Sequence, residues 1–191
     1  WFGRKWLSNW HWCNDGTLLS NYSKKIYKVG VEPVPKFAQE LTEKGILGEN
    51  FRYVTDYFSY EGPIQRFFTG AKVITAIAMF YDLEDPNQFL EDIKKTLHGQ
   101  GICVIQQNYL VAMLNQNAYD NIIHEHLTYF SLTSFENLLK KHKLEIVDVI
   151  ENDINGGSFR CYIAHKGVFA PSARLLAMRR FEKQLDWLAI L

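Results

Sequence analysis

The sequence has few cysteines, and none of them are paired in a motif. Its three cysteines, Cys13, Cys103 and Cys161, are odd in number and widely spaced, and no C-x-x-C pair occurs. This pattern argues against a disulfide framework and supplies no cysteine zinc module; it fits a protein of the reducing cytoplasm. Cys103 and Cys161 lie within apolar runs, so we expect both to be buried as small hydrophobic side chains.

An excess of charge and a long apolar run are also absent. Lys and Arg together number 21, and so do Asp and Glu, which gives no field that would attract nucleic acid or an anionic membrane. The longest apolar runs, such as residues 73–80, are too short to cross a bilayer, and no signal segment opens the chain. The composition, 47% hydrophobic and 22% charged over 191 residues, predicts a globular protein.

Two common site motifs are missing. The G-x-G-x-x-G fingerprint does not occur, which argues against a usual NAD site, and the helical H-E-x-x-H zinc spacing does not occur either. No internal repeat and no low-complexity tract is present.

Strand-like and helix-like segments alternate along the chain. We expect strands at 26–31, 51–54, 72–79, 102–105, 145–150 and 159–164. We expect helices starting near 18, from 35 to Gly45, from 86 to Gly99, from a Thr133–Glu136 capping box, and between 171 and 191. The alternation favours an open α/β sheet with mainly parallel strands. The polar stretch 106–117 is the expected join, giving a Rossmann-like domain over 1–106 and a partial α/β C-terminal domain over 107–191.

The last helical segment carries an apolar stripe of Met178, Phe181, Leu185 and Leu188. Such a stripe needs a covering surface, and the chain starts with Trp rather than Met. We therefore expect the chain to be a fragment of a longer protein.

The first half has residues suited to a nucleoside cofactor. In open α/β sheets, ligands bind beyond the carboxyl ends of strands, where a turn leads into a helix. Asn14, Asp15 and Gly16 stand at such a turn, and Glu32 ends the next strand, where a carboxylate can accept both ribose hydroxyls. Taken alone, N-D-G is a plain turn. With Glu32, and without the glycine fingerprint, the pattern favours S-adenosylmethionine.

The second half contains three consecutive titratable residues, His124, Glu125 and His126, in apolar and aromatic surroundings at residues 119–130. Such a cluster serves a structural hydrogen-bond network, a metal ion or a proton transfer. Imidazole beside a carboxylate suits a general base.

These motifs together resemble the S-adenosylmethionine-dependent sugar C-methyltransferases, which act on nucleotide-linked keto-deoxysugars. The matching stretches are 13–19, 30–33, 79–86, 119–130 and 155–160, in the family's order and spacing. The resemblance implies a Rossmann-like class I methyltransferase domain. It implies that His126 removes the proton at C3, alpha to the C4 carbonyl, with Glu125 beside it in the active site.

The same resemblance suggests roles for the other candidate residues. Asn14, Asp15 and Gly16 would hold the methionine portion of the cofactor, Glu32 the ribose and Asp56 the adenine amino group, while Ala78 and Met79 would line the methyl-transfer cleft. The substrate-side candidates are Tyr109, His124, Asn155, Gly157, Ser158 and Arg160. Asp56 as a solvated loop residue, Ala78 and Met79 as core, and Arg160 as a surface residue remain alternatives, and His124 is expected to be chiefly structural.

Some positions depart from the family pattern. Trp10, His11 and Trp12 replace the usual residues at the end of the first strand, Ile123 replaces a Tyr, and Gln106 replaces an acidic residue. The family's N-terminal zinc module is absent, and so is much of its C-terminal unit. Two other classes therefore stay open: a non-catalytic Rossmann-like domain that has lost cofactor binding, and a metalloenzyme using His124 and His126. The sugar, its nucleotide and the oligomeric state are not defined by the sequence.

Overall fold

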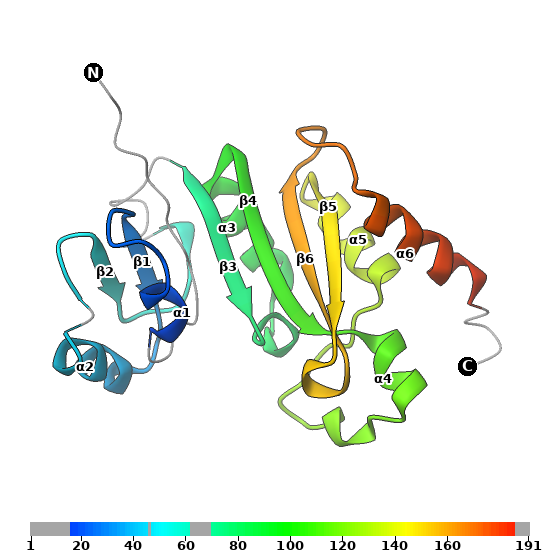
Figure 1. The fold of residues 1–191 in the computed structure, drawn as a ribbon, viewed down its shortest axis with the longest axis horizontal. Helices are drawn as coiled ribbons and strands as arrows, with labels where there is room; N and C mark the ends of the chain where they lie inside the picture. The colour runs from blue at the N-terminus through cyan, green and yellow to red at the C-terminus, as the bar shows by residue number, and fades with distance from the viewer. Residues whose placement is uncertain (1–15, 46, 62–69, 186–191) are drawn as a thin grey trace. The chain divides into compact units, whose positions relative to one another are not determined.

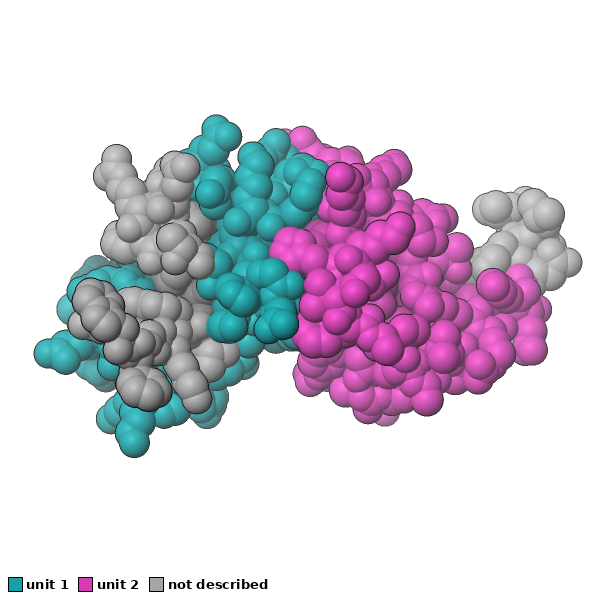
Figure 2. Space-filling view, turned by 90° about the horizontal axis from the view of Figure 1, so that it is seen from above, with its two compact units in different colours: residues 1–77, 88–104 teal, residues 78–87, 105–191 magenta. Residues whose placement is uncertain are grey.

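The computed structural model describes residues 16–45, 47–61 and 70–185. The chain divides into two compact units (Figure 2), one of residues 1–77 and 88–104 and the other of residues 78–87 and 105–191. Several residues named in the sequence analysis lie outside the described part of the chain: Trp10, His11, Trp12, Asn14, Asp15 and Leu188.

The first unit contains a two-stranded parallel sheet (Figure 1). Its strands are β1 (Lys28–Val31) and β2 (Phe51–Val54), with Lys28 opposite Phe51, and helices α1 (Thr17–Ser20) and α2 (Pro35–Glu43) accompany them. Leu19 of α1, Leu41 of α2 and Phe51 form its small core. The expected elements of this region are thus confirmed, and Pro35 at the first position of α2 suits a helix start.

The rest of this unit contains β3 (Ala71–Ile77), most of α3 (Pro86–Thr96) and the first part of β4 (Leu97–Asn108), with β3 and β4 as neighbours. The expectation that the helix runs to Gly99 is wrong, because α3 ends at Thr96 and β4 runs through both Gly99 and Gly101. At Gly101 a Cβ would lie 2.6 Å from the Ala71 carbonyl oxygen, so glycine there allows a close approach of backbones.

The second unit has the strand order β4-β6-β5, with β5 at Leu144–Asn152 and β6 at Ser158–His165. These two strands are antiparallel, from Leu144 opposite His165 to Asn152 opposite Ser158. The expectation of mainly parallel strands is wrong for this pair, because the connection over 153–157 is too short for a parallel crossover. The short helix η4 (Ile154–Gly156) forms that connection.

Helices α5 (Leu132–Lys141) and α6 (Ala173–Gln184) pack on β5 and on each other. Buried aromatic rings fill the core under α5: Phe135 lies 5.3 Å from both Phe80 and Phe130, centroid to centroid, and 6.1 Å from Phe159. Cys103 and Cys161 are free and buried, as expected. No helix in the described part of the chain is long and apolar enough to cross a membrane.

Two helix details differ from the expectations. Ser131 and Ser134 form the capping box of α5, whereas Thr133 and Glu136 bond to α6. On α6 the buried residues are Leu175, Met178 and Glu182, while Phe181 is 42% exposed.

The stretch 106–117, expected to join the two domains, has regular secondary structure. Gln106, Gln107 and Asn108 are buried at the end of β4, and α4 (Leu110–Gln116) follows Tyr109. A polar run normally predicts a loop, so the buried amide side chains of this stretch gave no signal that the strand continues to Asn108.

Candidate functional site

The cofactor-side glycine precedes the first helix. Gly16 is the N-cap of α1 and has a φ of 72°, in the left-handed region that glycine adopts without strain. A Cβ at Gly16 would lie 2.3 Å from Leu41 Cδ2, so no other side chain fits without repacking. This position therefore allows only a glycine-like backbone, as close approach to a ligand also requires.

Glu32 directly follows β1 and is 2% exposed. Its backbone N–H donates to the Val54 carbonyl over 3.0 Å, and its Oε1 accepts from the Val34 N–H over 3.0 Å. These bonds fix a carboxylate at the carboxyl end of a parallel strand, where such folds bind a ribose. Asp56, after β2, is exposed and accepts from the Tyr57 N–H over 2.7 Å.

Ala78 and Met79 follow β3. Ala78 is exposed and has a φ of 53°, which strains a non-glycine residue, and its N–H donates to the Gln106 carbonyl over 2.9 Å. Met79 is 2% exposed, so its side chain packs in the core. Of this pair, only Ala78 is exposed.

His126 is held in one orientation. Its Nδ1 lies 2.8 Å from the Asn121 carbonyl oxygen, which can only accept, so Nδ1 carries the proton. The lone pair of the neutral ring is therefore on Nε2. The Tyr81 ring packs on His126 with centroids 4.4 Å apart, and the Tyr81 carbonyl accepts the N–H groups of Leu127 and Thr128 over 3.0 and 3.1 Å. This arrangement provides an acceptor nitrogen suited to a general base.

Asp82 lies near this imidazole. It ends the short helix η2 (Phe80–Asp82), and its Oδ1 is buried with no hydrogen-bond partner among the described residues. Burial raises the pKa of the Asp82 carboxyl, the charge of His126 lowers it and Glu125 raises it. Sequence reasoning missed Tyr81 and Asp82, although both stand in the stretch 79–86 that carried the family resemblance.

The other two members of the triplet are exposed. The His124 and Glu125 side chains are 93% and 59% exposed, and His124 Nε2 lies 3.3 Å from Glu125 Oε1. Within the described part of the chain, neither side chain hydrogen-bonds to His126, whose ring is oriented by the Asn121 backbone carbonyl. Among the described residues, no group of three or more His, Cys, Asp or Glu side chains could hold a metal ion. The hypothesis of a metal ion bound by His124 and His126 therefore has no third protein ligand in the described part of the chain.

Three substrate-side candidates are buried and bonded within the fold. Tyr109 is 1% exposed and its hydroxyl donates to Glu182 over 2.9 Å; burial and the Glu182 carboxylate raise the pKa of that hydroxyl. The Ser158 hydroxyl donates to the Ile154 carbonyl over 2.8 Å. A Cβ on Gly157 would lie 2.4 Å from the Ala112 Cβ. These contacts favour structural roles for all three residues.

Asn155 and Arg160 are less enclosed. Asn155 is exposed, with a φ of 53°, and its carbonyl accepts from Asn121 Nδ2 over 3.1 Å. Arg160 is half-buried, and its Nε donates to Gln106 Oε1 over 2.8 Å. The Gln106 that replaces the family's acidic residue thus gives Arg160 a neutral partner.

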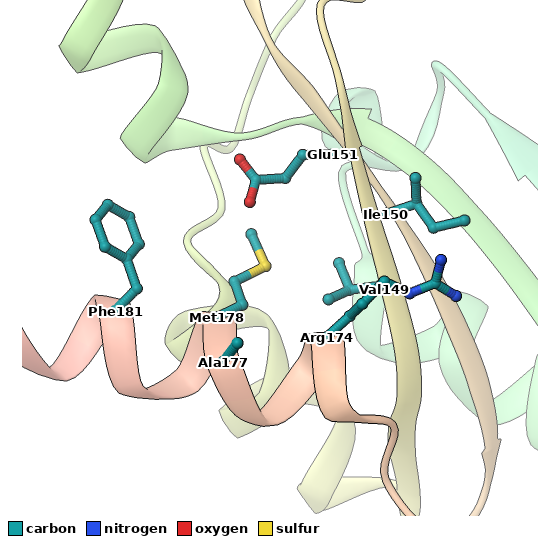
Figure 3. A pocket seen from close by; sticks show the side chains of 7 residues that line it. All are labelled: Val149, Ile150, Glu151, Arg174, Ala177, Met178 and Phe181. Atoms are coloured by element: carbon teal, nitrogen blue, oxygen red, sulfur yellow. The ribbon is translucent and has the colours of Figure 1, made fainter.

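A cavity of about 460 Å³ adjoins the His126 segment. Its walls are mostly apolar and come from α4, the short helix η3 (Tyr119–Asn121) and the residues that follow, including Met113, Ile122 and Tyr129. A second cavity of about 480 Å³ lies between β5 and α6 (Figure 3), where Met178 and Phe181 face Glu151. This second cavity contains none of the predicted site residues.

Comparison with known proteins agrees with this geometry. Residues 13–149 match the family described as methyltransferase domain, and the chain belongs to that family. The chain is also similar to the C-methyltransferase NovU of Streptomyces niveus, with 34% identity over 94 residues, which is 49% of this chain and 22% of NovU.

Solved structures show the same fold at low identity. The mitomycin 7-O-methyltransferase MmcR superposes with a TM-score of 0.66 at 15% identity, over 83% of this chain and 48% of MmcR. The magnesium protoporphyrin IX methyltransferase ChlM of Synechocystis PCC 6803 superposes with a TM-score of 0.63 at 8% identity, over 84% of this chain and 74% of ChlM. The chain spans less than a quarter of NovU and about half of MmcR.

Proposed function

We propose that this chain is part of an S-adenosylmethionine-dependent C-methyltransferase acting on a nucleotide-linked keto-deoxysugar whose carbonyl is at C4. Membership of the methyltransferase domain family and the similarity to a C-methyltransferase support the reaction class. The observation that carries the proposal is the 2.8 Å contact of His126 Nδ1 with the Asn121 carbonyl, which leaves Nε2 as a proton acceptor.

The residues present fit the cofactor. Glu32 offers a buried carboxylate at the carboxyl end of β1, which suits the two ribose hydroxyls, and Gly16, at the start of α1, is proposed for the methionine portion. Asn14 and Asp15 complete the proposed methionine end, and Asp56 is proposed for the adenine amino group. When bound, the cofactor supplies an electrophilic methyl group.

His126 would act in its neutral form. Nε2 takes the proton from C3 of the sugar, the C3–H electron pair moves into the C3–C4 bond, and the carbonyl π electrons move onto the C4 oxygen to give an enolate. The C3 carbon of that enolate then accepts the methyl group. The positive charge formed on the ring would be stabilised by the Asp82 carboxylate, whose charge interacts with that of His126. Glu125 is proposed to lie beside His126 in the active site.

The remaining polar groups suit the substrate side. Arg160 is proposed to contact the nucleotide part, with Asn155 and His124 as further polar contacts, while Ala78 offers its exposed face. Tyr109, Gly157 and Ser158 are proposed to support this unit from within.

Methyl transfer from isotope-labelled cofactor to a nucleotide-linked deoxysugar with its keto group at C4 tests the proposal. We expect NMR to show the labelled methyl on C3, and His126→Asn to lower kcat by about 10²–10⁴-fold with cofactor affinity nearly unchanged. The variant His124→Asn is the matched control, because its exposed ring should matter less. Label on a sugar oxygen, or a His126→Asn variant with parental kcat, would contradict the proposal.

A further inference from the structure

Asn121 connects three segments of the second unit. Its backbone carbonyl accepts from His126 Nδ1 over 2.8 Å and from the Tyr129 hydroxyl over 3.3 Å. Its side-chain Oδ1 accepts from Asn108 Nδ2 over 3.3 Å, and its Nδ2 donates to the Asn155 carbonyl over 3.1 Å. One residue thus joins the end of β4, the η4 loop and the imidazole.

The loop side of this connection depends on glycine. Gly156 has a φ of 70°, and a Cβ there would lie 3.0 Å from Asn121 Nδ2 and 2.9 Å from the Ala118 Cβ. Gly157 likewise has a φ of 107° and lies against Ala112. Both glycines therefore let the loop approach α4 and η3 closely enough for the bond between Asn121 and Asn155.

The strand side is rigid. Asn108 is the last residue of β4 and is 5% exposed, and Tyr109, the next residue, is fixed by its N–H bond to the Gly157 carbonyl over 3.1 Å. The Asn121 side chain is thus held between a buried strand end and the η4 loop. The Asn121 backbone carbonyl accepts the hydrogen bond from His126 Nδ1–H. Any shift of Asn121 therefore also shifts the imidazole ring and its Nε2 lone pair.

We infer that Asn121 is a positioning residue that sets the tautomer and orientation of His126, and that the Asn155–Gly157 loop supports it in this role. The inference rests on the proposed function for its catalytic meaning. It gives the N-G-G motif a purpose other than substrate contact: the motif fixes the base.

The tautomer of His126 is the direct readout. In ¹⁵N-labelled chain without substrate, at a pH where the ring is neutral, we expect two-bond ¹H–¹⁵N correlation spectra to show Nδ1 protonated and Nε2 unprotonated. In Asn121→Ala, which lacks both side-chain bonds, the Nδ1–H population should fall; Gly156→Ala, which perturbs the loop from the other side, should have the same effect. An Nε2–H tautomer in the parent, or unchanged spectra in both variants, would overturn the inference.

A control variant separates this effect from general loss of a surface amide. Asn137→Ala removes an exposed amide on α5 and should leave the His126 spectrum as in the parent. In the methyl-transfer assay, Asn121→Ala should lower kcat about 10–100-fold and leave KM within about twofold, since misplacement of a catalytic group by about 1 Å can cost 10²-fold. A loss confined to KM would assign Asn121 to substrate binding instead.

The two hypotheses fail separately. If the spectra show the expected tautomer and its loss in the variants, but His126→Asn keeps parental activity, the positioning holds and the proposed base is wrong. If His126→Asn is inactive but the tautomer is unaffected by Asn121→Ala and Gly156→Ala, the base stands and the positioning role is wrong.

Discussion

Replacing Glu182 with Gln should destabilise the second unit substantially. Glu182 is 1% exposed on α6, and its carboxylate accepts four hydrogen bonds. Oε1 accepts from the Tyr109 hydroxyl over 2.9 Å and the Leu132 N–H over 2.6 Å. Oε2 accepts from the Thr133 N–H over 2.8 Å and the Thr133 hydroxyl over 2.6 Å. The carboxylate therefore lies at the N-terminus of α5, where a negative charge is favourable.

Glutamine has nearly the same shape but only one acceptor oxygen. Whichever way the amide is turned, its NH₂ group faces a backbone N–H, of Leu132 or of Thr133, which then lacks an acceptor. A buried unsatisfied donor costs about 1–3 kcal/mol, and the remaining bonds weaken from charge-assisted to neutral strength. Removal of a buried charge offsets part of this loss. We expect a net loss of about 2–4 kcal/mol in the free energy of unfolding.

Urea unfolding followed by far-ultraviolet circular dichroism measures this loss. Tyr109→Phe is the comparison variant, because it removes only one of the four bonds and should cost about 1–2 kcal/mol. If Glu182→Gln unfolds at the parental urea midpoint, the carboxylate does not hold α6 to α5 and the reasoning is refuted.

Three further predictions concern carboxylates. In calorimetry, Glu32→Ala should weaken S-adenosylhomocysteine binding by about 1–3 kcal/mol. Glu43→Ala, which changes an exposed carboxylate of α2, should leave the affinity unchanged. If Glu32→Ala binds as tightly as the parent protein, Glu32 is not part of the site. Asp82→Asn should raise stability at neutral pH, because burial raises the folded-state pKa of Asp82 and so disfavours its ionised form. In thermal melts this gain should vanish at acid pH, where Asp82 of the parent protein is protonated. A variant that is less stable than the parent at neutral pH would contradict this. The hydrogen bond from Arg174 lowers the pKa of Asp148 in the folded protein, so Asp148→Asn should be less stable than the parent above the unfolded-state pKa. This difference in stability should fade as the pH falls through the folded-state pKa of Asp148. A difference that does not change with pH would show that ionised Asp148 does not stabilise the fold.

The fold could be read from the sequence where the signals are local. The strand 51–54, the helix starting at Pro35 and the position of Glu32 at a strand end follow from apolar runs and a proline, and the structure confirms these elements. The same local signals failed for α5. Ser131, Thr133 and Ser134 all carry hydroxyls that could cap this helix. The Thr133 hydroxyl instead donates to Glu182, about fifty residues away, and Ser131 is the N-cap.

The geometry around the base could not be read from the sequence. The triplet 124–126 indicated a titratable cluster, but it is Asn121, not Glu125, that bonds the His126 ring. The bonds of Asn121 to Asn108 and Asn155 join positions 13 and 34 residues apart, and no local pattern encodes such pairs. The family resemblance suggests Tyr109 and Ser158 as substrate-side residues, but their hydroxyls are bonded inside the fold, to Glu182 and to the Ile154 carbonyl.

Proton exchange at the sugar's C3 tests the central claim most directly, because it observes the action of the base without methyl transfer. A nucleotide-linked deoxysugar with its keto group at C4 is incubated with the protein in D₂O together with S-adenosylhomocysteine, and loss of the C3 proton signal is followed by NMR. We expect exchange with the parent protein and a rate at least about 10²-fold lower with His126→Asn. Exchange at the parental rate in His126→Asn would show that another residue is the base.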